Sequence, residues 1–291
     1  MPELPEVEVT RRGLLAQLPG RTVRRIFCSQ YRLRQSMPRR LLQSEIVGQQ
    51  VQTVDRRAKY LLVRMVSGAI IVIHLGMTGK LGIIAAGIPR HKHDHLILSL
   101  DNDLEVRFND CRRFGSIAVW PAEDAASRET AFSKEEGLEP FGSDFTANNL
   151  FELARTRRIP VKSFLMNSKI IAGVGNIYAN EILFATGINP LQVVHRITLQ
   201  EWQRIVEAGR RILQQAIDAG GSTISDFLGT SGHPGYFQLQ LQVYGRKGQA
   251  CLHCATPISK TEVSGRATYY CPNCQKLDTL VVKKRQCEVP E

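Results

Sequence analysis

Four of the seven cysteines form two Cys-x2-Cys pairs, and this spacing constrains the fold more than any other feature of the 291-residue chain. Cys251 and Cys254 form the first pair, and Cys271 and Cys274 form the second. Each pair directs two thiolates toward one point, and four thiolates make a closed tetrahedral Zn²⁺ site without an open position for water. Two redox pairs are the alternative, but two copies at this spacing favour one structural zinc ion.

The residues between the two pairs predict a β-hairpin whose tip lies near SGRA, 264–267. A zinc hairpin that presents Arg266 at its tip indicates contact with a nucleic-acid groove, although the same ribbon also suits binding to a protein. His253 is interpreted as a bystander rather than a ligand. The remaining thiols lack partners at metal-binding spacing: Cys28, Cys111 and Cys287.

The charge of the chain is strongly positive but unevenly distributed. Lys and Arg total 38 against 27 Asp and Glu, which gives a net charge of +11. The segment 121–145 is acidic, so the rest of the chain is more basic than the total suggests. Such an excess favours a polyanionic partner, although a merely basic soluble protein fits the charge equally well.

The N-terminus lacks the basic and apolar regions of a signal peptide. The longest apolar run, around 69–77, is much shorter than a membrane span. We therefore expect an intracellular protein with no membrane partner.

Residues 1–120 predict a helix followed by antiparallel strands. The segment 5–18 has apolar residues that can share one helical face, and Pro5 suits a first turn. Short β-rich runs then follow between Gly, Asn and Asp clusters, which is typical of a sandwich or barrel. The clearest runs are VQTVDR, KYLLVRM, AIIVIHL, HLILSL, LEVRFN and SIAVW.

The pattern becomes helical from Asn148 onward. Thr198 and Glu201 form a capping box for a helix that runs to about Ala219, and the Gly- and Ser-rich segment 220–238 predicts a mobile loop. The chain is therefore predicted to be an α+β protein. Its predicted parts are a helix and β-sandwich domain (1–120), an acidic linker (121–145), a helical domain with the mobile loop (146–238), a zinc hairpin (240–276) and a tail (277–291).

A glycine-rich turn, IAGVGN, precedes one of the predicted helices. Gly173 and Gly175 allow a ligand to approach the backbone, and the free amides at a helix start favour an anion. Asn176 adds a side-chain donor. A DNA phosphate is one candidate ligand, and a tight turn between helices is an equally good interpretation.

The tip MPELPE carries a possible nucleophile. Removal of Met1 would leave Pro2 with a secondary α-amine, and α-amines have a pKa of about 7.7–8.0. Attack of that amine on a sugar C1′ gives an iminium ion, which is an electron sink for later eliminations. Glu3 adjoins it and can donate a proton. For this motif alone, a helix start shaped by Pro2 and Pro5 is the simpler interpretation.

Seven motifs in order give the chain a specific resemblance. They are MPELPEVE, RRAKYLL (56–62), HLGMTGKL (74–81), KHDH (92–95), NDCRRFG (109–115), AGVGNIYANE (172–181) and GRATYYCPNC (265–274). Together they resemble the bacterial formamidopyrimidine-DNA glycosylase family, whose members remove oxidised purines such as 8-oxoguanine. The similarity runs from Met1 to about Lys276.

The resemblance implies a fold and a set of roles. The fold is an N-terminal helix with a β-sandwich, a helix–two-turn–helix domain and a zinc-finger hairpin. Pro2 resembles the Schiff-base nucleophile and Glu3 the adjacent acid. Lys59 matches the lysine linked to β-elimination and phosphate contact. Arg266 matches the hairpin arginine associated with DNA binding and δ-elimination.

The resemblance also implies DNA contacts. Asn176 matches a phosphate-binding asparagine, and His93, Arg112 and Arg157 fall where the family contacts the backbone or the opposite base. Because an extruded base leaves a gap in the duplex, wedge residues are needed, and Met77, Arg112 and Phe114 match them. Core residues at strand ends are the alternative interpretation of Met77 and Phe114. The loop 220–238 matches the lid over the base.

Three other functions compete with this one. The sister glycosylase, endonuclease VIII, prefers oxidised pyrimidines, but its tip usually has Gly where this chain has Leu4. A non-catalytic damage-binding protein would not need Pro2, Glu3 and Lys59 together. A zinc-ribbon interaction protein leaves the N-terminal motifs unexplained. We therefore expect a monomeric bacterial enzyme, cytoplasmic and nucleoid-associated, that acts on double-stranded DNA with oxidised bases or abasic sites.

Overall fold

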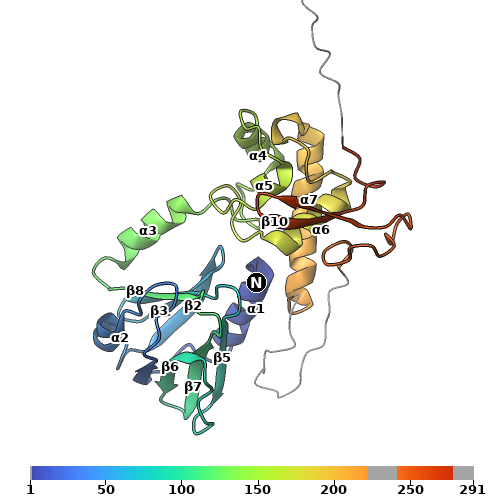
Figure 1. The fold of residues 1–291 in the computed structure, drawn as a ribbon. Helices are drawn as coiled ribbons and strands as arrows, with labels where there is room; N and C mark the ends of the chain where they lie inside the picture. Colours follow the sequence, from blue (N-terminus) through green and yellow to red (C-terminus); the bar gives the residue numbers. More distant parts are fainter. Residues whose placement is uncertain (1, 222–240, 278–291) are drawn as a thin grey trace, which may run out of the picture.

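The computed structural model describes residues 2–221 and 241–277. The chain opens with helix α1 (Leu4–Leu15), which starts from a capping box formed by Glu3 and Glu6. The helix buries Leu4, Val7 and Leu14, as the apolar spacing predicts. Figure 1 shows α1 between the β-sandwich and the helices and hairpin of the C-terminal half.

Two four-stranded antiparallel sheets follow within residues 23–120. The first has the order β1 (Val23–Cys28), β6 (Asp94–Leu100), β7 (Leu104–Asn109), β5 (Lys80–Ala85). The second has the order β2 (Val51–Arg57), β3 (Tyr60–Met65), β4 (Ile70–His74), β8 (Ser116–Trp120). The predicted sandwich is confirmed.

The facing sides of the two sheets form the larger hydrophobic core, which α1 and α2 (Arg39–Glu45) help to close. Leu61, Ile71 and Phe108 are among its fully buried members. Each such side chain contributes roughly 1.5–3 kcal/mol through removal from water. This core gives the loops at the sheet ends a rigid support.

The acidic segment 121–145 was predicted to be a linker, but it contains helix α3 (Ala125–Glu135). Phe132 packs edge-on against Trp120, with ring centroids 5.5 Å apart. Glu129 accepts hydrogen bonds from the Arg64 guanidinium at 2.9 and 2.6 Å. Within this acidic segment, Glu129 therefore forms an ion pair with the sheet.

The C-terminal half begins with a helical module. Its helices are α4 (Ala147–Ala154), α5 (Val161–Leu165), α6 (Asn176–Thr186) and α7 (Leu199–Asp218), with a 3₁₀ turn at Val194–Arg196. Phe164, Tyr178 and Trp202 fill its core. The predicted capping box at Thr198 is present, and α7 ends where expected.

The cysteine segment forms the predicted hairpin from β9 (Ser259–Val263) and β10 (Arg266–Tyr270). Its turn residues, Ser264 and Gly265, both have positive φ angles, 50° and 71°. The hairpin lies against α6, where the Tyr269 amide donates to the Asn180 side chain at 2.8 Å. The loop predicted at 220–238 and the tail lie almost wholly outside the described residues.

No helix within residues 2–221 and 241–277 has the length and apolar character needed to cross a membrane.

Candidate active site

The N-terminal tip is fixed by a buried carboxylate. Glu3 is only 1% exposed, and its carboxylate accepts hydrogen bonds from the amides of Gly175 and Ile177, both at 2.8 Å, and of Tyr178 at 3.4 Å. These amides form the N-terminus of α6, where the helix dipole favours a negative charge. A terminus that would otherwise fray is therefore locked between the two halves of the protein.

The glycine turn before α6 leaves the space that this N-terminal tip occupies. A Cβ atom added at Gly175 would lie 2.4 Å from the Glu3 carboxyl carbon, and one at Gly173 would lie 2.7 Å from Leu4 Cβ. Gly173 also has a φ of +82°. The Glu3 carboxylate thus occupies the amides of Gly175, Ile177 and Tyr178 at this helix start, and the phosphate contact predicted for Asn176 stays a prediction.

Lys59 reaches the same place from the β-sandwich. It follows β2, and its Nζ donates to the Val174 carbonyl at 3.0 Å. Burial raises the pKa of Glu3, and the nearby Lys59 ammonium partly offsets that rise. Burial lowers the pKa of Lys59, with Glu3 acting in the opposite direction. A carboxyl group and an amine shifted toward neutrality are suited to proton transfer.

An ionic cluster around Glu139 holds the backbone before Lys59. The Glu139 carboxylate accepts the Ala58 amide at 2.6 Å and the guanidinium groups of Arg56 and Arg57 at 3.0 Å. Ala58 has a φ of 54°, in the left-handed region. Because Glu139 lies beyond the sandwich in the chain, this cluster also joins the two halves of the protein near the site.

The zinc hairpin brings Arg266 toward the same junction. Lys162 is buried in α5, and its Nζ donates to the Ala267 carbonyl at 2.8 Å and to Thr268 Oγ1 at 2.7 Å. Burial lowers the pKa of Lys162 to about 8. Asn176 Nδ2 donates to the same Ala267 carbonyl at 3.1 Å. Arg266 itself is exposed at the start of β10. The structure thus brings Pro2, Glu3, Lys59, Asn176 and Arg266 to one region.

Sequence reasoning missed Glu6 as part of this region. Its carboxylate accepts the Glu3 amide at 2.8 Å and the Tyr178 hydroxyl at 2.8 Å. The Glu-x-x-Glu spacing of a capping box was the available signal. Glu139 and Lys162 gave no comparable local signal, because their partners are distant in sequence.

A second group of predicted residues lies on two adjacent loops. Met77 is 39% exposed and Phe114 is 45% exposed, which excludes the core-residue interpretation of both. The Arg112 guanidinium carbon lies 4.9 Å from the Phe114 ring centroid. Asp110 joins the loops by accepting from Thr78 Oγ1 at 2.5 Å and from the Gly115 amide at 2.8 Å. Two rigid loops therefore present an apolar and cationic edge.

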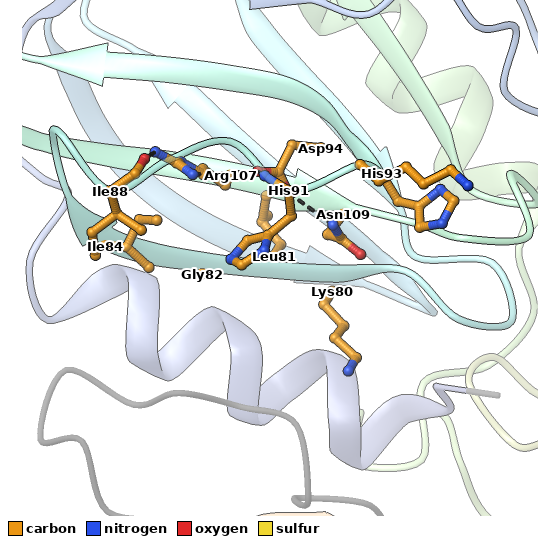
Figure 2. Close-up of a pocket in the computed structure, with 11 residues that line it drawn as sticks. Lys80, Leu81, Gly82, Ile84, Ile88, His91, His93, Asp94, Arg107 and Asn109 are labelled. Carbon is orange, nitrogen blue, oxygen red and sulfur yellow. Dashed lines mark hydrogen bonds and ion pairs between the residues drawn. The ribbon is translucent and has the colours of Figure 1, made fainter.

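His93 lies beside this edge, because its carbonyl accepts the Asp110 amide at 3.0 Å. Its ring lines a pocket of about 500 Å³ on the β5–β7 side of the sandwich (Figure 2). In the lining of this pocket, Asn109 Nδ2 donates a hydrogen bond to the Asp94 carboxylate at 2.7 Å. The pocket lining includes neither Glu3 nor Lys59, so this cavity is distinct from the Glu3 site.

The hydrogen bonds of Arg157 lie within the helical module rather than at the Glu3 site or at the loops of Met77 and Phe114. It lies just after α4, where its guanidinium donates to the Leu153 carbonyl. Its own carbonyl lies 3.2 Å from His195 Nδ1. These bonds place Arg157 in the helical module and leave its predicted DNA contact untested.

The four predicted metal ligands converge. The sulfur atoms of Cys251, Cys254, Cys271 and Cys274 all lie within 4.8 Å of one another. The Sγ atoms of Cys254 and Cys271 are 3.5 Å apart, and those of Cys251 and Cys274 are 3.9 Å apart. Tetrahedral thiolates about 2.3 Å from Zn²⁺ would be separated by about 3.8 Å. The residues therefore fit a closed structural zinc site.

This fold and site define a class of protein: DNA glycosylases with a β-sandwich, a helix–two-turn–helix module and a zinc finger. Residues 1–117 match the model of the formamidopyrimidine-DNA glycosylase N-terminal domain. Residues 137–228 match the H2TH domain of the same proteins, and residues 248–277 match the zinc finger found in FPG and IleRS. The chain belongs to the formamidopyrimidine-DNA glycosylase family.

Individual relatives cover nearly the whole chain. A formamidopyrimidine-DNA glycosylase of Nitrosococcus oceani is 46% identical over 275 residues, which is 94% of this chain and 100% of the relative. A Lactococcus lactis FPG mutant in complex with DNA containing Fapy-dG superposes with a TM-score of 0.84 at 31% identity, covering 94% of this chain and 100% of that one. The wild-type Lactococcus lactis protein in complex with DNA containing an oxidised pyrimidine superposes with a TM-score of 0.83 at 32% identity. This match also covers 94% of this chain and 100% of that one.

Proposed function

We propose that the chain is a bifunctional DNA-repair enzyme that excises oxidised purines, including 8-oxoguanine and formamidopyrimidines, and then cleaves the strand at the abasic site. The observation that carries this proposal is the locked N-terminal tip, which places Pro2 and Glu3 beside Lys59. A non-catalytic binding protein would not need Pro2, Glu3 and Lys59 together at this junction. The matched family and its relatives support the same activity.

Access to the damaged base requires extrusion of its nucleotide, at a cost of a few kcal/mol of stacking. Met77 and Phe114 offer apolar side chains for the gap left in the duplex, and Arg112 offers donors to the orphaned base. Their exposure on rigid loops supports this role, because little ordering is needed when DNA binds.

The chemistry follows from the amine of Pro2 after removal of Met1. The amine forms a bond to C1′, the bond from C1′ to the base breaks, and the departing base takes a proton that Glu3 can supply. The nitrogen then loses its proton, and its lone pair forms the double bond to C1′ as the C1′–O4′ bond breaks and O4′ takes up a proton, which opens the sugar ring. The resulting iminium ion acidifies the C2′ proton. Loss of that proton expels the 3′ phosphate in β-elimination, with Lys59 close enough to assist. A second elimination expels the 5′ phosphate, and Arg266 offers a cation to it.

Substrate preference separates this proposal from its nearest rival. Leu4, which favours the purine enzyme over endonuclease VIII, is fully buried against Gly173 and does not face a ligand. It therefore marks ancestry rather than base recognition. The test compares base release from duplexes containing 8-oxoguanine or an oxidised pyrimidine. Faster release of the purine supports the proposal, and faster release of the pyrimidine supports the rival.

The zinc ion would be held by the four cysteines and would supply structure rather than catalysis, because four thiolates leave no open position. We propose that the protein acts as a monomer. We further propose that the protein acts in the bacterial cytoplasm on nucleoid DNA. The bacterial origin of its relatives and the nature of its substrate support this location.

The coupling between Glu3 and Lys59 gives a prediction about pH. Because the Lys59 ammonium lowers the pKa of Glu3, Lys59→Met should raise that pKa further, so Glu3 keeps its proton to higher pH. The measurement is a ¹³C NMR titration of the glutamate carboxyl groups, with Glu3 assigned by its absence from Glu3→Gln. Lys59→Arg is the control and should leave the titration nearer that of the wild type. An unchanged Glu3 titration in Lys59→Met would contradict the pairing.

A further inference from the structure

The loop between β1 and α2 carries an exposed aromatic ring on a cationic surface. Tyr31 is 57% exposed, more than any other Phe, Tyr or Trp side chain in residues 2–221 and 241–277. Its surrounding segment, QYRLRQSMPRR (30–40), holds four arginines and no acidic residue. An exposed ring among cations is the composition of surfaces that bind single-stranded nucleic acid.

The loop is held in place at several points. The Ser29 amide donates to the His95 carbonyl at 2.9 Å, and the Arg34 amide donates to the Gly115 carbonyl at 3.0 Å. Leu33 anchors the middle of the loop and is only 4% exposed. The ring of Tyr31 is thus presented by a fixed backbone, so little conformational entropy is lost when a ligand stacks on it.

The ring is also oriented by its neighbours. His95 lies edge-on to it, with centroids 6.0 Å apart and planes at 82°. Both nitrogens of the buried His95 ring are engaged, with Ser29 Oγ at 2.8 Å and the Asp110 carbonyl at 2.9 Å. The Arg113 guanidinium carbon lies 5.5 Å from the Tyr31 centroid, within cation–π range. His95 therefore supports the ring from its side, and Arg113 lies over it.

Arg113 connects this ring to the DNA-facing edge. It stands between Arg112 and Phe114 in the loop that Asp110 fixes. The hydrogen bond from the Arg34 amide to the Gly115 carbonyl also joins the loop of Tyr31 to the loop of Phe114. The faces of bases inside a duplex are covered by their neighbours, whereas an unpaired base leaves a face free to stack on such a ring.

We propose that Tyr31 and Arg113 form a stacking platform for one unpaired nucleobase, supplied by single-stranded DNA adjoining the duplex that holds the lesion. This inference rests on the proposed function, because it takes the Met77 and Phe114 edge as the DNA-binding face. Stacking is tolerant of sequence, since every base has a π-face. The platform directs the enzyme toward lesions beside gaps, bubbles and strand ends.

The test compares dissociation constants at one salt concentration for a blunt duplex and for junction duplexes, all containing a tetrahydrofuran abasic analogue. The junctions carry unpaired thymidines on either side of the lesion and on either strand. Stacking of one base strengthens binding by roughly five- to 150-fold. We expect at least one junction to bind the wild type about five-fold or more tightly than the blunt duplex.

Three variants test whether the gain in affinity for the junction duplex depends on the Tyr31 ring. Tyr31→Leu should abolish it, and Tyr31→Phe should keep it because the ring remains. Phe141→Leu removes another exposed aromatic side chain, 41% exposed and outside the proposed sites, and should leave the gain unchanged. No gain in the wild type on any junction, or a full gain in Tyr31→Leu, would overturn the platform.

The same protein and DNA samples distinguish a failure of this inference from a failure of the proposed function. Base release from the blunt 8-oxoguanine duplex tests the enzyme alone. Normal release without a junction gain refutes only the platform. A Tyr31-dependent gain without release on any duplex refutes the enzyme and keeps the platform.

Discussion

Glu3→Gln is expected to lower the rate of base release by about 100- to 10,000-fold, the range typical for loss of a general acid. The amide cannot donate a proton to the departing base. It also places an NH₂ group against the backbone amides that Glu3 now accepts from, at Gly175 and Ile177. Single-turnover release of 8-oxoguanine measures the first effect directly.

A second substrate separates chemistry from positioning. A preformed abasic site has already lost its base, so strand cleavage there does not need the proton for base departure. We expect Glu3→Gln to retain a much larger share of this cleavage than of base release. If both activities fell in parallel, Glu3 would serve only to hold the tip, and its assignment as the acid would be wrong.

Cys251→Ala is expected to remove the zinc ion and most of the affinity for DNA. Structural zinc supplies roughly 10–16 kcal/mol to small zinc-binding folds, so the hairpin should unfold without its metal. Arg266 would then lose its position. Hydrogen bonds to charged groups contribute about 1.5–3 kcal/mol, so loss of that contact should weaken binding about ten-fold or more.

Metal content and DNA affinity are measured together in this experiment. Cys28→Ala is the matched control, because Cys28 lies in β1 and does not belong to the sulfur cluster. It should retain one zinc ion per chain. A full zinc content in Cys251→Ala would show that the metal is bound elsewhere.

Much of the site was predictable because its signals are local. The two Cys-x2-Cys pairs define a metal site by spacing alone, and the structure brings all four sulfurs together. Short β-rich runs between clusters of Gly, Asn and Asp predicted most strands of the sandwich. β5 was missed because Gly82 interrupts it, and β1 because two adjacent arginines, Arg24 and Arg25, interrupt its apolar pattern.

The remainder depended on contacts between distant segments. The acidic residues of α3 resemble a linker until Arg64 is placed beside Glu129. The glycine turn before α6 resembles a phosphate site until the Glu3 carboxylate occupies it. Glu139 and Lys162 are single charged residues whose roles appear only when the sandwich, the helices and the hairpin meet.

The most direct test of the central claim is borohydride trapping on a duplex with one 8-oxoguanine opposite cytosine, followed by mapping of the adduct. Reduction of an iminium ion leaves a stable bond between the sugar and the attacking amine. We predict a covalent adduct on the N-terminal peptide at Pro2, and its loss or sharp reduction in Pro2→Gly with binding to damaged duplex largely retained. An adduct that maps to Lys59, or no adduct despite tight binding and an exposed Pro2 amine, would contradict the assignment of Pro2 as the nucleophile.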